Sequence, residues 1–391
     1  MSKARPRLAI INRSFWPIYP VIGEALLRFA EQHVDSLDVS VIMQDHADIR
    51  SQLAIHGRGK GVTFYPCKAL SVSRSSVATR ILDAVFFMVW VFLVLVWKRP
   101  SQVYVSTDPP VLVPFVVMCY CRLFGARYTY HLQDIHPEAT NVAIPVNGLV
   151  FRFFRWLDGV TMRHASLLIT ITDEMATYIR SRSATRAPIE VLSNPSVAFE
   201  DVAMPAQRQP GFTFCGNAGR LQRMPLLLEA IRRYTDGGGR LPFVFAGGGV
   251  YAADLKALAA GYDNVEYLGL VSARRAAEVN AAYQWALLPI EDEVTLYAFP
   301  SKSSSYVYSG AFIAAICGAH TSVASWVREN RLGVVIDAQV DALVDFFHAV
   351  ERGEVDTSVL DTDRGALKEK LSFEVFVAAL AHLIVTEPAH D

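Results

Sequence analysis

A short stretch late in the chain has the residues to bind a phosphate. Its members combine proline, serine, lysine and glycine: Pro300, Ser301, Lys302, Ser303, Ser304, Ser305 and Gly310. Proline and serine favour the start of a helix and glycine favours its end, so the stretch predicts one short helix. Free backbone N–H groups at such a start, beside Lys302, suit an anionic phosphate. Serine-rich helix starts are common, however, and most of them bind no ligand.

The order of residues around Lys302 resembles the donor-phosphate segment of GT-B glycosyltransferases of the family 4 type. The shared pattern is P-S-K, then a tyrosine, then a small residue and glycine before an apolar strand. That family normally carries here two glutamates, eight residues apart, which grip the donor sugar and ribose. Tyr297 and Ser305 occupy these positions in this chain. The resemblance therefore implies the family's architecture, with a departure at its best-known motif.

A glycine turn after a predicted strand provides a second phosphate contact. Gly216 and Gly219 allow the backbone to approach a ligand closely. Arg220 lies where the family places a basic residue on the donor diphosphate, and a guanidinium matches phosphate oxygens in bidentate fashion. The resemblance thus assigns Arg220 and Lys302 to the leaving diphosphate. The family's frequent lysine slightly further on is matched only approximately, by Gln222 followed by Arg223.

Other predicted donor contacts come from loops that follow strands. Gly248 lies in a triple glycine that suits a ligand-facing loop, although such a run alone is a weak signal. The family holds the nucleotide base by backbone contacts near Leu268 and Gly269. Glu291 or Glu293 could replace a missing motif glutamate by binding sugar hydroxyls. An ordinary solvated acidic loop explains these two residues equally well.

The acceptor side is predicted at a polar cluster in the first half of the chain. Asp134, Pro137 and Glu138 resemble the D-x-x-P-E element of bacterial polysaccharide glycosyltransferases, at the end of a central strand. Ligands of open α/β sheets bind at such strand ends. Asp134 and Glu138 are therefore assigned to acceptor orientation. His136 lies between the two carboxylates, so it is either an acid/base residue or a loop histidine with satisfied hydrogen bonds.

The elements that must position these residues alternate between strands and helices along the whole chain. This alternation predicts an α/β fold of the GT-B type, with two doubly wound Rossmann-like domains facing a cleft. Residues 1–195 are expected to form an acceptor-binding, membrane-associating domain, and residues 196–370 a nucleotide-sugar-binding domain. Residues 371–391 are expected to form a helix that crosses back to the first domain, as in the family.

Composition excludes several classes of protein. With 391 residues, 52% apolar and 19% charged, the chain is long and apolar enough for two packed domains. Residues 1–195 hold 21 Lys+Arg against 14 Asp+Glu, whereas the rest hold 16 against 24. The basic half favours an anionic surface, and the acidic half argues against general nucleic-acid binding. The five cysteines show no metal-binding spacing and are expected to be reduced, and no signal peptide is expected.

A long apolar run in the first half points to a membrane. Residues 84–97 are all apolar, and the wider segment 51–99 has seven basic residues and one acid. Fourteen helical residues cover about 21 Å, short of the roughly 30 Å of a bilayer core, so a spanning helix is not expected. A core helix is one alternative. The flanking charges and the stripe Phe86, Trp90, Leu93 and Trp97 favour monotopic attachment instead.

A second helix, expected over residues 149–166, could also touch the membrane. It contains several aromatic residues together with Arg152, Arg155 and Arg163. A half-buried helix with solvated arginines is at least as good an explanation.

Together these features predict a retaining, metal-independent glycosyltransferase without a cofactor. The donor is expected to be a nucleotide sugar, UDP-linked by preference, and the acceptor a polyprenyl-diphosphate-linked glycan in exopolysaccharide, capsule or O-antigen assembly. The expected location is the cytoplasmic face of the inner membrane. The main alternative is a catalytically silent GT-B subunit that binds the membrane and a partner glycosyltransferase. An epimerase of the same fold is a weaker third.

Overall fold

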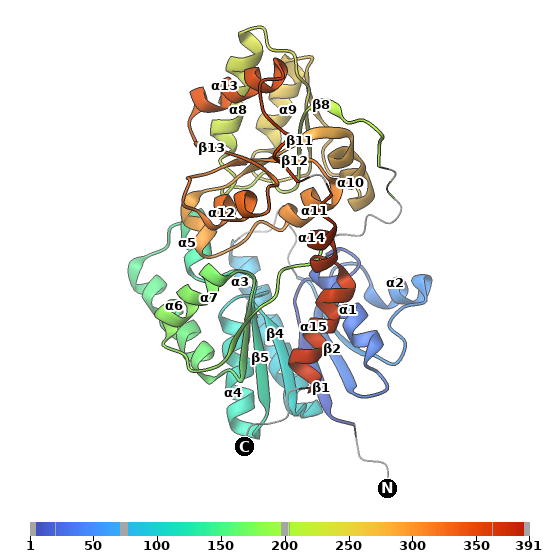
Figure 1. Ribbon diagram of the computed structural model, residues 1–391. Coiled ribbons are helices and arrows are strands. Elements are labelled where there is room, and N and C mark those ends of the chain that lie inside the picture. Colours follow the sequence, from blue (N-terminus) through green and yellow to red (C-terminus); the bar gives the residue numbers. More distant parts are fainter. Residues whose placement is uncertain are drawn as a thin grey trace. The chain divides into compact units, whose positions relative to one another are not determined.

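The structure is a computed structural model that describes residues 5–19, 21–70, 77–196, 202, 204–361 and 363–386. It divides into two compact units, one formed by Met1–Pro195 with Phe373–Asp391 and the other by Ser196–Ser372. Each unit contains a parallel sheet with helices on its faces (Figure 1). The predicted fold class, α/β with two doubly wound Rossmann-like domains, is confirmed. Which ligand each unit binds stays a prediction.

The sheet of unit 1 has seven parallel strands among the described residues, in the order β3-β2-β1-β4-β5-β6-β7. The strands are β1 (Arg7–Ile11), β2 (Asp38–Asp45), β3 (Thr63–Lys68), β4 (Gln102–Ser106), β5 (Arg127–Leu132), β6 (Leu167–Thr170) and β7 (Ile189–Val191). Chain order runs outward from β1 to β3 and then resumes at β4 on the other side of β1. The carboxyl ends of β1 and β4 therefore form the switch point of the sheet.

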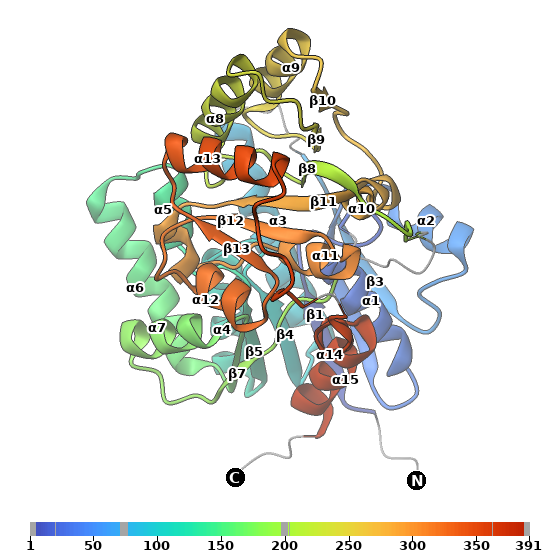
Figure 2. The same ribbon diagram turned by 45° about the horizontal axis from the view of Figure 1, so that its top comes forward.

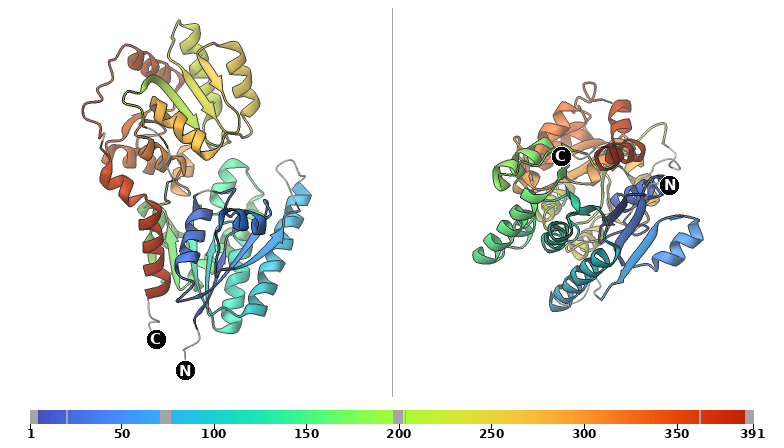
Figure 3. Two further views of the ribbon diagram at one scale, coloured as in Figure 1. Left: turned by 90° about the vertical axis from the view of Figure 1, so that its right-hand side faces the viewer. Right: turned by 90° about the horizontal axis from the view of Figure 1, so that it is seen from below.

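Helices cover both faces of this sheet. One face carries α1 (Ile22–Gln32) and, from the end of the chain, α15 (Phe373–Ala381), which pack against each other. The other carries a row of helices in which α4 (Leu112–Phe124) contacts both α3 (Val77–Lys98) and α6 (Gly148–His164) (Figure 3). Three further helices complete the unit: α2 (Ile49–His56), α5 (Glu138–Ala143) and α7 (Asp173–Ser183). The short π-helix η2 (His382–Thr386) follows α15.

The core on the α1 side joins the two ends of the chain. Leu8 and Ile10 of β1 pack with Leu26 of α1 and with Phe376 and Leu380 of α15. Because both faces of a parallel sheet are covered, its central strand β1 is apolar apart from Arg7. The α15 side chains belong to the core of unit 1, so the C-terminal segment is part of the first domain.

The sheet of unit 2 has six parallel strands within the described ranges, in the order β10-β9-β8-β11-β12-β13. They are β8 (Gln209–Cys215), β9 (Phe243–Ala246), β10 (Val265–Tyr267), β11 (Tyr283–Pro289), β12 (Phe312–Ile316) and β13 (Gly333–Ile336). The order reverses at β8, which pairs with β9 on one side and β11 on the other. This pair of neighbours marks the second switch point.

The core of unit 2 lies mainly between the sheet and α8 (Met224–Asp236), α9 (Ala252–Gly261) and α13 (Val340–Glu351). On the other face, α10 (Ala273–Ala282) packs beside α11 (Lys302–Ser309) (Figure 2). The remaining elements are η1 (Asp292–Leu296), α12 (Ser322–Glu329) and α14 (Gly365–Lys370). The predicted short helix at Lys302 is present as α11, and the αL conformation of Gly310 ends it.

Candidate functional site

Lys302 lies beside the loop that leaves β8 at the second switch point. Its Nζ is 3.8 Å from the centroid of the Phe214 ring, and a Cβ built on Gly216 would lie 3.5 Å from it. The Nζ atom is buried and has no hydrogen-bond partner among the described residues. Burial lowers the pKa of the amine to about 7. A buried amine without an acceptor is costly, so this position suits an anion that supplies one.

Glycines allow the loops after β8, β9 and β10 to meet. A Cβ on Gly247 would lie 1.9 Å from the carbonyl oxygen of Gly216, and the φ of Gly247 is +129°, so only glycine fits there. The N–H of Ala218 donates to Gly248 at 2.7 Å, and the N–H of Gly247 donates to Gly269 at 2.7 Å. The structure thus brings Gly216, Gly248 and Gly269 together at one edge of the sheet.

Two other predicted donor residues lie in the same loops. Leu268 follows β10, and its N–H donates to the carbonyl of Phe245 at 2.9 Å. The N–H of Gly219 donates to the side chain of Gln222 at 2.9 Å. Gln222 therefore stabilises the glycine turn through its side chain. The approximate match of Gln222 to a family lysine did not indicate this role.

The serines at the start of α11 are mostly engaged within their own turn. The N–H of Ser303 donates to the backbone carbonyl of Pro300 at 3.0 Å, and the hydroxyl of Ser304 donates to the backbone carbonyl of Ser301 at 3.0 Å. Ser303 and Ser304 are buried, and Ser305 is half-buried. The N–H of Ser303 already has an acceptor, so the Lys302 side chain is the feature of this helix start best placed for a phosphate.

Arg220 is exposed in the turn between β8 and α8. Within the part of the chain that the structure describes, it forms no hydrogen bond or ion pair, so its guanidinium is free to bind an anion. Arg223 differs, because it lies 2.9 Å from Asp292 and 3.4 Å from Glu291 and donates to the carbonyl of Ile290. Glu291 is therefore held at the end of β11 by an ion pair, and contact with a sugar stays a prediction.

Asp134 follows β5 at the carboxyl edge of the sheet in unit 1. Burial, together with the nearby Asp108, raises the pKa of its carboxyl to about 6. Asp108 follows β4 and accepts the N–H of Ser14 at 2.7 Å. The structure thus places an acidic pair close to the first switch point. The sequence alone did not indicate that Asp108 lies near Asp134, because this proximity depends on the pairing of β4 with β5.

Glu138 lies in a buried ion-pair network rather than free at the strand end. Its carboxylate lies 2.8 Å from Arg182 and 3.0 Å from Arg155, and it accepts the hydroxyl of Tyr178. Arg182, 1% exposed, also lies 2.6 Å from Asp158. The network ties α5, α6 and α7 together. Glu138 is therefore well placed to hold the D-x-x-P-E loop, and direct contact with an acceptor stays a prediction.

His136 is held by its neighbours. Its Nδ1 lies 2.8 Å from the hydroxyl of Thr140, and its carbonyl accepts a hydrogen bond from Arg182 at 2.9 Å. Burial and the Arg182 charge lower the pKa of the imidazole to about 4. The ring is uncharged at neutral pH, which matches a satisfied loop histidine; an acid/base role stays a prediction.

Helix α3 is longer than the apolar run from which it was predicted. It spans Val77–Lys98, and its stretch Thr79–Lys98 is long and apolar enough to cross a membrane by length and composition. The length argument against a spanning helix was therefore wrong. However, α3 connects two strands of one parallel sheet, and Phe87, Val91 and Leu95 are buried in unit 1. One side of the helix is thus committed to protein.

The other side of α3 is an exposed apolar stripe. Its members recur every three to four residues: Ile81, Leu82, Val85, Phe86, Val89, Leu93 and Trp97. Trp90, predicted in this stripe, is half-buried and donates to the carbonyl of Tyr65. Helix α6 exposes a second set, Leu149, Val150, Phe153 and Trp156. Arg152 and Arg155 are exposed beside them, so we name these two stripes with their arginines the apolar face.

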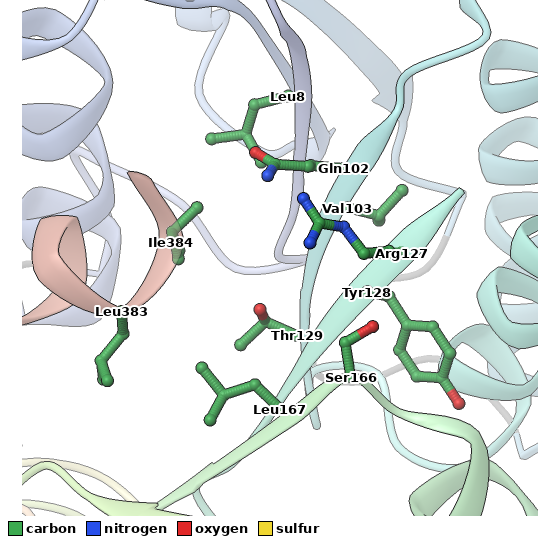
Figure 4. Close-up of a pocket in the computed structure, with 10 residues that line it drawn as sticks. All are labelled: Leu8, Gln102, Val103, Arg127, Tyr128, Thr129, Ser166, Leu167, Leu383 and Ile384. Atoms are coloured by element: carbon green, nitrogen blue, oxygen red, sulfur yellow. The ribbon is translucent and has the colours of Figure 1, made fainter. Parts of the chain in front are cut away.

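A small pocket lies at the amino edge of the sheet in unit 1, away from the carboxyl edge that carries Asp134 (Figure 4). Its volume is about 50 Å³, and Arg127 and Thr129 of β5 line it together with Leu383 and Ile384 of η2. Asp134 leaves the other end of β5, so this pocket takes no part in the candidate site.

The fold of the two units is that of GT-B glycosyltransferases. Sucrose-phosphate synthase from Thermosynechococcus elongatus superposes with a TM-score of 0.68 at 13% identity, covering 97% of this chain and 98% of that one. Anabaena HepE, solved with UDP, gives 0.63 at 12% identity, covering 97% and 100%. WaaG, described as a glycosyltransferase of lipopolysaccharide biosynthesis, gives 0.65 at 13%, covering 97% and 100%. At such identities these likenesses show the fold.

The sequence itself matches a family. Residues 22–195 match the model of the glycosyl transferase 4-like domain family, so the resemblance to GT-B glycosyltransferases of the family 4 type is confirmed. No curated protein is similar enough in sequence to count as a match.

Proposed function

We propose that the chain transfers a sugar from a nucleotide sugar, by preference a UDP-sugar, to a lipid-linked glycan acceptor. The observation that carries this proposal is the buried Lys302 amine beside Gly216, which has no acceptor among the described residues. Arg220 lies exposed in the adjoining turn. Two cations at one switch point match the two negative phosphates of a nucleoside diphosphate.

In this proposal Lys302 and Arg220 stabilise the charge that develops on the leaving diphosphate. Such stabilisation is usually the largest catalytic contribution, and one well-placed donor is worth about 3 kcal/mol. Because these side chains supply the positive charge, the reaction requires neither a metal nor a cofactor. The family's retaining course, with the acceptor attacking on the face that the phosphate leaves, needs no carboxylate nucleophile. HepE was solved with UDP, which supports a UDP-linked donor.

The acceptor is proposed to bind unit 1 near Asp134 and Asp108. The apolar face supports an acceptor anchored in a membrane, since apolar stripes flanked by arginines suit an anionic leaflet. A polyprenyl-diphosphate-linked glycan has such an anchor. Its use in exopolysaccharide, capsule or O-antigen assembly, at the cytoplasmic face of the inner membrane, agrees with the stated role of WaaG. We propose monotopic attachment, because α3 is packed on one side against its own sheet.

Thermal unfolding with UDP and GDP tests the donor site. Ligand at about 100 times its Kd adds roughly 2.7 kcal/mol to the stability of the protein, enough for a clear shift in Tm. We expect a UDP-selective shift that disappears in Lys302→Ala and Arg220→Ala. Lys256→Ala is the matched control, since Lys256 is exposed on α9. Equal shifts in all variants would contradict the assignment of both cations.

A specific observation favours the silent subunit as a second candidate. Tyr297 follows η1 and Ser305 lies in α11, so neither motif position offers a carboxylate to a sugar. The two candidates differ in turnover: an active transferase releases UDP from a UDP-sugar when acceptor lipid is present. A UDP shift without release from any UDP-sugar would favour the silent subunit.

A further inference from the structure

A pocket of about 270 Å³ lies between the last turn of α3 and the sheet of unit 1. Its floor contains Ala9, Ser40 and Thr63, one residue from each of the three adjoining strands. These side chains are small, so the helix and the sheet leave a space between them. We name it the α3 pocket. It lies near the amino ends of β1, β2 and β3, whereas Asp134 and Asp108 lie at the carboxyl edge.

The polar groups of the α3 pocket leave one cation without a counter-charge. Arg7 and Asp38 line the pocket and lie 4.0 Å apart, so they largely neutralise each other. Lys98 also lines it, and no described carboxylate lies within ion-pair distance of its amine. Arg7, Asp38 and Lys98 together carry a net charge of one positive unit, which a ligand with a single negative charge would balance. Ser40 and Thr63 add hydroxyl groups that donate to or accept from a polar ligand.

Aromatic rings hold the Lys98 amine at the pocket. Its Nζ lies 4.1 Å from the centroid of the Trp97 ring and 5.2 Å from that of Tyr65. The Trp97 ring also contacts Tyr65 edge to face, with centroids 5.9 Å apart. Trp97 is 69% exposed and ends the apolar stripe of α3. Tryptophan with a neighbouring lysine is typical of the depth at which lipid headgroups meet acyl chains.

We propose that the α3 pocket binds the phosphate headgroup of a membrane phospholipid with one net negative charge. Lys98 pairs with the phosphodiester, and Ser40 and Thr63 bond to the hydroxyl groups of a headgroup such as glycerol. The apolar wall formed by Val94, Leu95 and Trp97 covers the first carbons of the lipid. This inference deepens the membrane part of the proposed function, because it places a specific lipid where the apolar stripe ends.

The test uses a soluble lipid so that it does not depend on vesicle binding. Protein labelled with 5-fluorotryptophan is titrated with dihexanoyl-phosphatidylglycerol below its micelle concentration and followed by fluorine NMR. The chain has six tryptophans, so Trp97→Phe identifies the Trp97 signal, and buried Trp285 of unit 2 serves as reference. We expect a saturable shift at Trp97 and none at Trp285.

Two variants in the α3 pocket, one control variant and one free ligand test the chemistry of binding. Lys98→Gln should weaken the soluble lipid about tenfold, since it removes a charge-assisted bond, and Lys256→Gln should leave it unchanged. Ser40→Leu should abolish the shift by filling the floor; if it unfolds the protein, the surface variant Lys98→Gln still decides. Glycerol 3-phosphate should bind at least tenfold more weakly because it leaves the apolar wall uncovered. Equal binding of the free phosphate would overturn the lipid assignment.

Sedimentation with phosphatidylglycerol vesicles separates this inference from membrane attachment. Saturable binding of the soluble lipid without vesicle binding would support the α3 pocket and contradict the attachment. Vesicle binding without any shift at Trp97 would overturn the α3 pocket and leave the attachment standing. An unchanged affinity in Lys98→Gln would overturn the role of that lysine.

Discussion

The guanidinium of Arg182 lies 2.6 Å from the carboxylate of Asp158, and both side chains are buried. The same guanidinium lies 2.8 Å from Glu138, so a single cation on α7 compensates carboxylates from α5 and α6. Burial raises the pKa of Asp158, and Arg182 opposes that change. The hydroxyl of Tyr130 donates a further bond to Asp158 at 2.8 Å. The loop that carries Asp134 and His136 is therefore held in place by this buried ion-pair network, because Arg182 also donates to the carbonyl of His136.

We expect Arg182→Met to destabilise unit 1 strongly. Removing one partner of a buried ion pair leaves uncompensated charge and costs about 3–5 kcal/mol. Differential scanning calorimetry should show Tm lower by roughly 6–20 °C. Arg180→Met, at an exposed position of the same helix, is the control and should leave Tm nearly unchanged. Matching Tm values for the two variants would show that the network contributes little.

UDP affinity should fall as pH rises above 7. The Lys302 amine has a pKa of about 7 in the free protein, and a bound diphosphate favours its protonated form. Binding therefore takes up a proton at higher pH, and affinity should drop by up to about tenfold per pH unit between 7.5 and 9.5. The phosphate itself is fully ionised there, because its second pKa is about 6.

Isothermal titration calorimetry in buffers of different ionisation enthalpy measures both affinity and proton uptake. Lys302→Met should bind UDP weakly and without the pH dependence. A wild-type affinity that is constant from pH 7.5 to 9.5 would show that Lys302 does not face the diphosphate.

Asp134→Asn should stabilise the protein at pH 7 but not at pH 4. The folded pKa of Asp134, about 6, lies above the value of about 3.9 for an unfolded chain. Between these two pKa values the native state therefore binds more protons than the unfolded chain does. As the pH rises through 6, the wild-type protein loses stability relative to the Asp134→Asn variant. Urea unfolding at both pH values checks this, with Asp35→Asn as an exposed control. The variant should also transfer sugar more slowly, because Asp134 is assigned to the acceptor.

Attachment to vesicles should depend on the apolar face. The double variant Leu93→Gln, Phe153→Gln removes one exposed apolar group from α3 and one from α6. Full burial of such a side chain is worth about 1.5–3 kcal/mol, so partial insertion of both predicts at least tenfold weaker binding. Ile55→Gln, at an exposed position of α2 in the same unit, is the control. If the double variant and the Ile55→Gln control sediment equally with anionic vesicles, the apolar face is not the site of membrane attachment.

Much of the fold could be predicted because a buried strand is recognised from the apolar run of its own residues, without knowledge of its neighbours. The residues of β1 and β12 are apolar almost throughout, as expected for strands covered on both faces. Strand β3 was not predicted, because Pro66 interrupts its short apolar stretch. Proline is tolerated there since β3 lies at the edge of the sheet, and edge position is not visible in a local sequence.

The start of α3 was missed for a related reason. Asp83 interrupts the apolar pattern, so the sequence suggested that the helix begins after it. In the structure Asp83 is buried and accepts bonds from Arg13 at 2.9 Å and from Gln44 at 2.6 Å. These partners follow β1 and belong to β2, far away in sequence. A buried charge can be recognised only when its distant partners are known.

The candidate site was predicted where its chemistry depends on a motif, and missed where it depends on pairing between distant elements. Lys302 and Arg220 were proposed from their neighbours in sequence, and their contact with a diphosphate stays a prediction. Arg182 and Asp108 were not, because nothing adjacent to them indicates that they meet Glu138 or Asp134. Glu291 was also proposed from the sequence, but its ion pair with Arg223 becomes visible only when β8 and β11 lie side by side.

The place of α15 in the core of unit 1 has a consequence for biosynthesis. Ribosomes release a chain from its N-terminus onward, and domains generally fold as units while they emerge. Unit 2 is encoded entirely between Ser196 and Ser372, so all of its residues are available before translation ends. Unit 1, although it begins first, waits for Phe376 and Leu380 to complete its core. The unit that is started first is thus finished after unit 2, and a premature stop codon just before Phe373 would leave its hydrophobic interior exposed.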